Sequence, residues 1–289
     1  MNLVAGATGM LGGEICRLLV GQGQPVRALV RRTSNPEKIA ELEAIGAEIA
    51  YGDLKDPASL GPACRGVRAV VSTASSTLSR QEGDSIVSVD ERGQLNLVEA
   101  AERSGVGHFV LISFPEVAVA FPLQSAKRAA EARLRDGPTT YTILQPTLFM
   151  EVWLSPALGF DVAGGKVQIY GAGRNRLSWI SFQDVARFGV MVCGNPRAAN
   201  AVIELGGPEA LSPLDVVQLA EEMFGRKIAV QHVPEAALRE QYAAAKTSLQ
   251  KSFCGLMLYY AAGEVVDMSG TLRAFPGPPM RTVREHLQA

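Results

Sequence analysis

This sequence of 289 residues has few aromatic side chains and no excess of either charge. Aromatic residues make up 6% of it, and its 28 lysines and arginines nearly balance its 29 acidic residues. A protein that binds nucleic acid normally presents a basic surface, often with aromatic rings that stack on bases. We therefore expect no direct nucleic-acid partner.

Cysteines are also few and widely spaced. The four are Cys16, Cys64, Cys193 and Cys254, and no two of them form a Cys-x-x-Cys pair. Structural zinc sites use closely spaced pairs of ligands, and small secreted scaffolds use many cysteines. The three histidines show no metal-ligand spacing either. We expect neither a metal site nor a disulfide framework.

Long apolar runs are missing as well. A membrane-spanning helix needs roughly 18 or more consecutive apolar residues. The nearest candidate, residues 140–160, is interrupted by Gln145 and Glu151. The first residues also lack the basic start and long apolar stretch of a secretory signal. We expect no membrane partner and a cytoplasmic location.

Short apolar stretches alternate with helix-like spacing in the first half of the sequence. The expected strands are residues 3–5, 26–30, 48–51, 69–72, 109–113 and 141–144. Strands that alternate with helices predict a parallel sheet with helical crossovers. Strands that are apolar throughout agree with a sheet covered on both faces. The pattern predicts an α/β fold with a doubly wound, Rossmann-type parallel sheet.

A glycine-rich loop follows the first expected strand. Gly6 permits a tight turn, Gly9 lets the backbone approach a pyrophosphate, and Gly12 lets a helix pack closely on the strand. The free N–H groups and the dipole at the start of that helix attract phosphates. Strand, loop and helix in this order predict a dinucleotide site. Its expected residues here are Gly6, Thr8, Gly9, Met10, Leu11 and Gly12.

Two arginines end the second expected strand. A carboxylate there would bind the ribose 2′-hydroxyl of NAD, whereas Arg31 and Arg32 suit the 2′-phosphate of NADP. The alternative is a solvated basic turn. We therefore favour NADPH as the cofactor over NADH. Asp53, after the third strand, has two open interpretations: it accepts from the adenine amino group, or it caps the next helix.

The remaining cofactor contacts are expected in other loops at the same edge of the sheet. Ligands of open parallel sheets bind beyond the carboxyl ends of the strands. The loop after the sixth strand should meet the nicotinamide, unless Pro146 merely makes a rigid turn. The expected residues are Leu54, Thr73, Ala74, Ser75, Gln145, Pro146, Thr147 and Phe149.

The alternation of strands and helices stops after Pro146. We expect residues 1–150 to form an NADP-binding domain, to which the chain returns at about 176–206. Residues 151–175 and 207–289 should form a smaller lobe that binds a substrate or a partner. Its apolar stripe at Phe253, Leu256, Met257 and Tyr260 is either core, an oligomer face, or the roof of a substrate pocket.

These motifs together resemble the atypical short-chain dehydrogenases/reductases, most closely the NmrA-like and isoflavone-reductase-like branch. The resemblance also includes residues 96–100 and 180–186 and covers most of the chain. It implies binding of NADP(H). It further implies either reduction of quinones, enones, phenylpropanoids or triphenylmethane dyes, or redox sensing without turnover.

The resemblance also indicates catalytic residues. Typical members of the superfamily use a Ser, a Tyr and a Lys four residues after the Tyr. Ser113 and Lys127 match the Ser and the Lys, and both are expected to contact the cofactor, but Leu123 stands where the Tyr would be. A positioned proton donor contributes about 10²–10⁴ in rate. Its loss disfavours unactivated ketones and favours conjugated acceptors.

A literal Tyr-x-x-x-Lys occurs elsewhere, at Tyr242 and Lys246. It lies far downstream of the strand that should precede it, and a motif counts only in its structural context. We expect this pair not to be catalytic.

The sequence therefore predicts an NADPH-dependent oxidoreductase that reduces a small conjugated acceptor, such as a quinone or an enone. The alternative is a non-catalytic NADP(H)-binding sensor whose second lobe binds a protein partner. Either protein is expected to be a monomer or a homodimer.

Overall fold

The computed structural model describes residues 1–79 and 81–288, and the chain divides into two compact units. The first comprises Met1–Phe114, Pro122–Gln145 and Val185–Ile203. The second comprises Pro115–Phe121, Pro146–Asp184 and the chain from Glu204 onward. These bounds differ in detail from the expected division at 150 with a return at 176–206, most clearly because 115–121 belongs to the second unit.

A seven-stranded sheet forms the centre of the first unit, in the order β10-β6-β5-β4-β1-β2-β3. All strand pairs from β6 across to β3 are parallel. The strands are β1 (Asn2–Ala5), β2 (Val26–Val30), β3 (Glu48–Tyr51), β4 (Ala69–Ser72), β5 (His108–Ile112), β6 (Thr140–Pro146) and β10 (Ala201–Leu205). Parallel strands joined by helices place all the loops at their carboxyl ends on one edge of the sheet.

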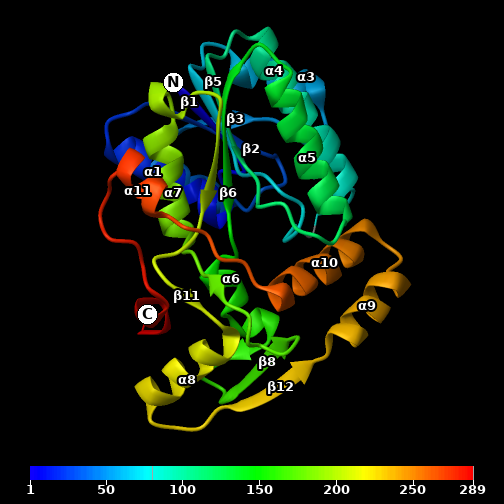
Figure 1. The fold of residues 1–289 in the computed structure, drawn as a ribbon. Helices are drawn as coiled ribbons and strands as arrows, with labels where there is room; N and C mark the ends of the chain where they lie inside the picture. Colours follow the sequence, from blue (N-terminus) through cyan, green and yellow to red (C-terminus); the bar gives the residue numbers. More distant parts are fainter. Residues whose placement is uncertain (80, 289) are drawn as a thin grey trace. The chain divides into compact units, whose positions relative to one another are not determined.

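Helices cover both faces of this sheet. They are α1 (Met10–Gly21), α2 (Pro36–Ala44), α3 (Pro57–Cys64), α4 (Arg92–Arg103), α5 (Pro122–Arg135) and α7 (Phe182–Val192), with a π-helix η1 (Ile86–Glu91) and a 3₁₀ turn η3 (Pro196–Ala198). Figure 1 shows α1 and α7 on one face and α4 and α5 on the other. This arrangement confirms the predicted α/β, Rossmann-type fold.

Local signals explain where the helices of the first unit begin. Asn35 and Asp56 cap α2 and α3, each accepting a hydrogen bond from a backbone N–H, and a proline follows each cap at the first helical position. The sheet then buries leucines against the helices, among them Leu3 of β1, Leu97 of α4 and Leu134 of α5. Burial of these apolar side chains drives the packing.

The second unit contains short helices and two small sheets. Its strands are β7 (Phe160–Asp161), β8 (Lys166–Tyr170), β9 (Leu177–Ser178), β11 (Ala210–Leu211) and β12 (Ala229–Val233), in sheets β12-β8-β7 and β11-β9. Its helices are α6 (Met150–Trp153), η2 (Pro156–Leu158), α8 (Pro213–Phe224), α9 (Glu235–Ala244), α10 (Ser248–Ala262), α11 (Ser269–Ala274) and α12 (Val283–Gln288). Ser212 caps α8: its side chain accepts from Asp215 N, and the two residues form a capping box.

A cluster of aromatic rings lies within the otherwise aliphatic core of the second unit. Tyr260 of α10 contacts the rings of Trp153, Tyr170 and Trp179, with centroids 5.5, 5.4 and 5.7 Å away. The apolar stripe of α10 is therefore core at Tyr260. Leu256 and Met257 are half-buried and pack against the same cluster.

Several side chains noted in the sequence have structural roles. His108 is buried: its Nδ1 accepts from Gly194 N at 2.8 Å, and its Nε2 lies 2.9 Å from the Thr142 hydroxyl. All four cysteines are free and buried, and burial raises the pKa of Cys64 and Cys193 to about 11. These positions contribute to packing rather than to a polar site.

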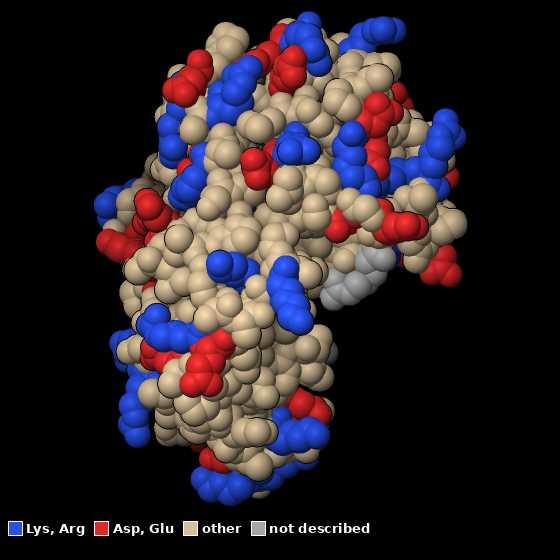
Figure 2. Space-filling view, turned by 90° about the vertical axis from the view of Figure 1, so that its right-hand side faces the viewer, with Lys and Arg blue, Asp and Glu red and all other residues tan. Residues whose placement is uncertain are grey.

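Charged side chains of both signs are mixed over the face drawn in Figure 2, which agrees with the near balance of acidic and basic residues. A basic field typical of nucleic-acid binding is not seen on that face. Within the described part of the chain, no helix is both long and apolar enough to span a membrane.

Two phenylalanines test how much the first unit's core contributes to stability. Phe109 in β5 is fully buried, and Phe109→Ala should lower the free energy of unfolding by about 3–5 kcal/mol through lost burial and a residual cavity. Phe224, at the end of α8, is 45% exposed, and Phe224→Ala should change the free energy of unfolding by less than about 1 kcal/mol. Urea unfolding curves measure both, and equal losses would contradict this account of the core.

Candidate functional site

The glycine loop between β1 and α1 has no room for side chains at its first and last glycines. Gly6 has φ +80°, and a Cβ atom there would lie 2.6 Å from Thr73 Oγ1. At Gly12 a Cβ atom would lie 2.2 Å from the carbonyl oxygen of Gly6. The helix therefore approaches the strand more closely than any residue with a side chain permits.

The start of α1 is left open by the same loop. Gly9 is the N-cap residue, and it donates its own N–H to Gly6 O at 2.9 Å. It offers no side chain to cap the first N–H groups of the helix. Uncapped N–H groups and the positive end of the helix dipole together attract an anion.

A cavity of about 330 Å³ opens beside this loop. Its volume lies within the range of roughly 300–1,000 Å³ that is usual for small-molecule sites. Predicted site residues on its lining are Gly6, Thr8, Gly9, Arg31, Asp53, Leu54, Thr73, Ala74 and Ser75. Lining residues that the sequence analysis missed are Leu29, Ser34, Gly52, Leu78, Ser79, Gln81, Asp84 and Val89.

A buried carboxylate at the rim of this cavity, Asp84, pairs with two cationic side chains: Arg31, which also lines the cavity, and Lys55, which lies outside the lining. Asp84 Oδ2 lies 2.6 Å from Arg31 Nη1, and Asp84 Oδ1 lies 2.6 Å from Lys55 Nζ. The Ser79 hydroxyl also donates to Asp84, whose side chain is only 3% exposed. Burial raises the pKa of Asp84, but the hydrogen bonds from Lys55, Ser79 and Arg31 outweigh it and lower that pKa to about 2.

The other predicted residues near this rim have separate positions. The Arg32 guanidinium lies over the ring of Tyr51, 5.1 Å from its centroid, and does not line the cavity. Asp53 Oδ1 accepts from Lys55 N at 2.9 Å and does not cap a helix, because the cap of α3 is Asp56. The helix-cap interpretation of Asp53 is therefore wrong, and its contact with the adenine amino group stays a prediction.

Ser113 and Lys127 lie in a buried polar network within the first unit. Ser113 Oγ donates to Glu131 Oε1 at 2.6 Å, and Gln145 Nε2 donates to the same oxygen at 3.0 Å. Lys127 Nζ donates to the carbonyl oxygen of Ile112 at 2.9 Å. Glu131, which organises this network, had no signal in the sequence beyond its position one turn after Lys127.

Burial controls the charge of Lys127. Burial lowers its pKa, and the nearby carboxylates of Asp90 and Glu131 oppose that shift. Asp90 lies in η1 and is fully buried; its Oδ2 accepts from the backbone N–H and the hydroxyl of Ser76. Within residues 1–79 and 81–288, Asp90 Oδ1 has no hydrogen-bond partner. Arg128 adds to the lowering, so the lysine is buried among side chains of both acidic and basic type.

Four cofactor contacts were expected around the end of β6. Gln145 lies in the first unit, and the other three residues lie in the second. Thr147 N donates to Leu205 O at 2.9 Å, and its hydroxyl donates to Ser178 O. Phe149 precedes α6 and pairs with Ile180, while Pro146 ends β6. These three residues do not line the cavity beside the glycine loop. The same is true of Met10, Leu11 and Gly12. The contacts of all six with a cofactor remain predictions.

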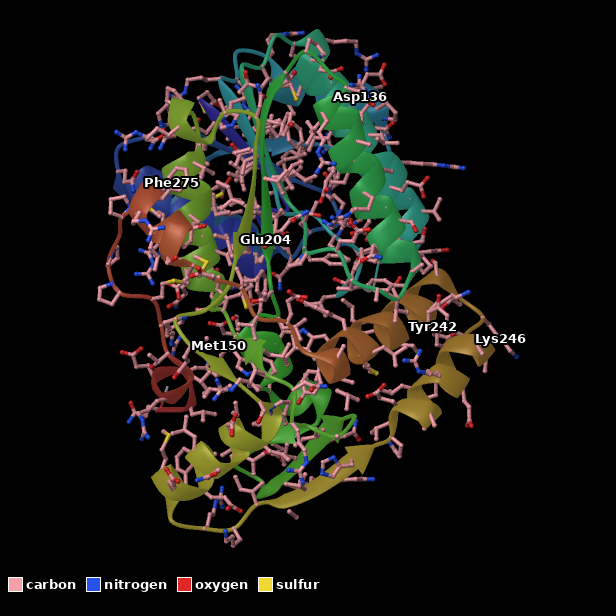
Figure 3. The ribbon with its side chains drawn as sticks, in the orientation of Figure 1. Asp136, Met150, Glu204, Tyr242, Lys246 and Phe275 are labelled. Atoms are coloured by element: carbon pink, nitrogen blue, oxygen red, sulfur yellow. The ribbon has the colours of Figure 1, made fainter. Side chains whose placement is uncertain are left out.

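Tyr242 and Lys246 do not form a catalytic pair in this structure. The Tyr242 hydroxyl donates to Ala120 O, and Lys251 Nζ lies 4.9 Å from the centroid of its ring. Helix α9 ends at Ala244, so Lys246 lies beyond it, as Figure 3 shows. Among the described residues, no group of three or more His, Cys, Asp and Glu side chains is arranged to hold a metal ion.

The glycine loop allows a matched pair of substitutions. Gly12→Ala should lower the free energy of unfolding by about 1–3 kcal/mol, because its methyl group would press on the Gly6 carbonyl. At Gly21, at the end of the same helix, a Cβ atom would meet nothing within 4 Å. Gly21→Ala should therefore be neutral or stabilising by up to about 1 kcal/mol. Thermal or urea unfolding distinguishes the two, and equal effects would argue against the close approach.

The ion pairs of Asp84 predict how stability depends on pH. A carboxyl whose pKa is lower in the folded than in the unfolded state stabilises the fold above its unfolded pKa, and this stabilisation is lost as the pH falls through its folded pKa. The wild-type protein should therefore be more stable than Asp84→Asn at pH 6, and the difference should shrink as the pH falls from about 4 to 2.

Asp56→Asn is the control for this measurement, since asparagine caps a helix as well as aspartate does and the change of charge is the same. Its free energy of unfolding should stay close to that of the wild type. A difference between wild type and Asp84→Asn that persists unchanged to pH 2 would refute the role given to the ion pairs.

Comparison with known proteins places this chain in a family. The model of the NmrA-like family matches residues 2–274. The photosystem II assembly factor Ycf39 of Synechocystis sp. is 32% identical over 244 residues, which cover 82% of this chain and 72% of that protein. The NAD(P)H azoreductase of Xenophilus azovorans is 29% identical over 295 residues, which cover 100% of this chain and 97% of that protein.

A solved structure agrees with the fold. The NADPH-dependent quinone oxidoreductase of Escherichia coli, in complex with NADPH, superposes with a TM-score of 0.78 at 23% identity, over 100% of this chain and 99% of that one. The match of the family model extends across both units described above. This chain belongs to the NmrA-like family.

Proposed function

We propose that this protein is an NADPH-dependent oxidoreductase that reduces a small conjugated acceptor, such as a quinone, an enone or a dye. The observation that carries the proposal is the position of Arg31. It directly follows β2 and lines the same cavity as the open glycine loop, so one cavity offers a site for a pyrophosphate and a cation for a 2′-phosphate.

The residues present fit such a cofactor. A Cβ atom would meet Thr73 Oγ1 at Gly6 and the carbonyl oxygen of Gly6 at Gly12, so glycine is required at both positions. The open N–H groups of α1 would hold the pyrophosphate. Arg31 would hold the 2′-phosphate with Lys55 nearby. The carboxylate of Asp53 would accept from the adenine amino group.

When bound, NADPH supplies a hydride to the acceptor. Lys127 would hold the nicotinamide ribose with its buried ammonium group, and Ser113 would contact the same end of the cofactor. Leu123, which is buried, offers no proton where a tyrosine would stand. An acceptor whose reduced form is a delocalised anion or a neutral molecule needs no strong proton donor, which favours conjugated substrates.

The names of similar proteins support this choice. One relative that matches this chain over its full length is an NAD(P)H azoreductase, and a structural neighbour is a quinone oxidoreductase. Both names denote reduction of a conjugated acceptor.

A second candidate is a non-catalytic NADP(H)-binding regulator that binds a protein partner. Two observations favour it: the similarity to a photosystem II assembly factor at 32% identity, and the leucine at position 123. This candidate requires the same cofactor site and no turnover.

Oxidation of NADPH by the purified protein, against a panel of quinones, enones, azo dyes and cationic dyes, tests the proposal. Lys127→Met keeps the length of the side chain and removes its charge. It should lower kcat/KM by about 10- to 100-fold, as expected for the loss of a charge-assisted hydrogen bond. Tyr242→Phe is the control and should leave kcat/KM unchanged, because that hydroxyl binds Ala120 O.

Binding of NADPH is measured in the same samples. Tight binding with no turnover across the panel would favour the regulator and direct the search toward protein partners. Absence of NADPH binding would reject both candidates.

A further inference from the structure

The rim of the cofactor cavity carries a negative charge that the sequence pattern of an NADP site does not anticipate. Asp84 lines the same cavity as Arg31 and bonds directly to its guanidinium. A carboxylate at this end of a dinucleotide site normally suits the 2′-hydroxyl of NAD, whereas an arginine suits the 2′-phosphate of NADP. This rim holds both groups, contributed by different segments of the chain.

The carboxylate is fixed in place. It is 3% exposed, and both of its oxygens are engaged, by Lys55 on one side and by Arg31 and Ser79 on the other. The neighbouring Gln81 ties the same segment to the turn after β2, with Oε1 accepting from the Thr33 hydroxyl and Nε2 donating to Thr33 O. These contacts hold Asp84 beside Arg31 in this structure, and its lowered pKa keeps it ionised at neutral pH.

The charges at this rim nearly cancel. Arg31, Lys55 and Asp84 together carry one net positive charge. Asp53 lies 3.8 Å from Lys55 Nζ, but its side chain is 34% exposed, so water screens it more strongly. A 2′-phosphate carries up to two negative charges and is attracted by the two cations but repelled by Asp84. A 2′-hydroxyl carries no charge and is nearly indifferent to all three.

We propose that Asp84 is a specificity-determining residue that narrows the preference of this site for NADPH over NADH. It does so by opposing the 2′-phosphate while leaving the 2′-hydroxyl unaffected. The proposal rests on the proposed function, because it concerns the cofactor of that same site.

Equilibrium binding of NADPH and NADH to wild type and Asp84→Asn at low ionic strength tests it. Asp84→Asn removes one negative charge beside Arg31 and should tighten NADPH binding about tenfold, which corresponds to about 1.4 kcal/mol. NADH binding should change by less than about twofold. The gain for NADPH should shrink as salt is added, because salt screens charges at the rim of an open cavity.

Asp56→Asn is again the matched control. It removes the same negative charge at the N-cap of α3, which does not line the cavity. It should leave the ratio of the two dissociation constants at the wild-type value.

Lys55→Gln provides a second variant with the opposite expectation, and it keeps the proposal testable if Asp84→Asn does not fold. Lys55 is partly exposed, and its removal leaves the rim without net charge. NADPH binding should weaken about tenfold, and NADH binding should stay unchanged.

The outcomes separate this inference from the proposed function. If Asp84→Asn weakens NADPH binding alone, Asp84 serves to orient Arg31 and the inference is wrong. If it weakens both dinucleotides equally, the residue only holds the loop, and the inference is again wrong. A wild-type protein that binds neither dinucleotide would instead reject the proposed function itself.

Discussion

The close approach of α1 to β1 is the constraint on which the candidate site depends. A Cβ atom at position 12 would lie 2.2 Å from the carbonyl oxygen of Gly6, so only glycine permits this packing. The same loop leaves the N-cap of α1 without a side chain and opens a cavity beside it. Because β1 pairs in parallel with β2 and β4, the ends of those strands bring Arg31 and Thr73 to that cavity. The close backbone approach thus positions the anion site, and the parallel pairing of the strands places Arg31 beside it.

Buried carboxylates then join the loops of the first unit. Asp84 connects the end of β2 with the segment after β3, through Arg31 and Lys55. Glu131 connects the end of β5 with the end of β6, through Ser113 and Gln145. A buried charge is tolerated only when it is paired and hydrogen-bonded, so each of these acids fixes its partners as firmly as it is fixed itself. The cofactor end and the Ser113–Lys127 end of the unit are both organised in this way.

The strands of the first unit can largely be predicted from the periodicity of the sequence, whereas the contacts between its polar side chains cannot. The strands β2 and β4 match the predicted ranges, since runs of apolar residues bounded by turns report burial directly. The glycine loop and Arg31 were predicted from strand, loop and helix in order. Lys55 directly follows Leu54, so the rule that ligands bind beyond the carboxyl ends of parallel strands could have identified it. The same rule could not identify Asp84, because Asp84 pairs with an arginine 53 residues away and lies in a segment without periodicity. In the second unit, β12 is mostly exposed and so lacked an apolar pattern, and no pattern marked 115–121 as part of that unit.

The burial of the four cysteines bears on chemical durability. Thiolates, rather than thiols, add to electrophiles such as quinones and enones. Burial raises the pKa of every cysteine here, to about 12 for Cys16 and about 11 for Cys64 and Cys193. Each sulfur is therefore both shielded from solvent and protonated at neutral pH. We therefore expect these cysteines to react slowly with conjugated electrophiles, the class of molecules that the protein is proposed to reduce.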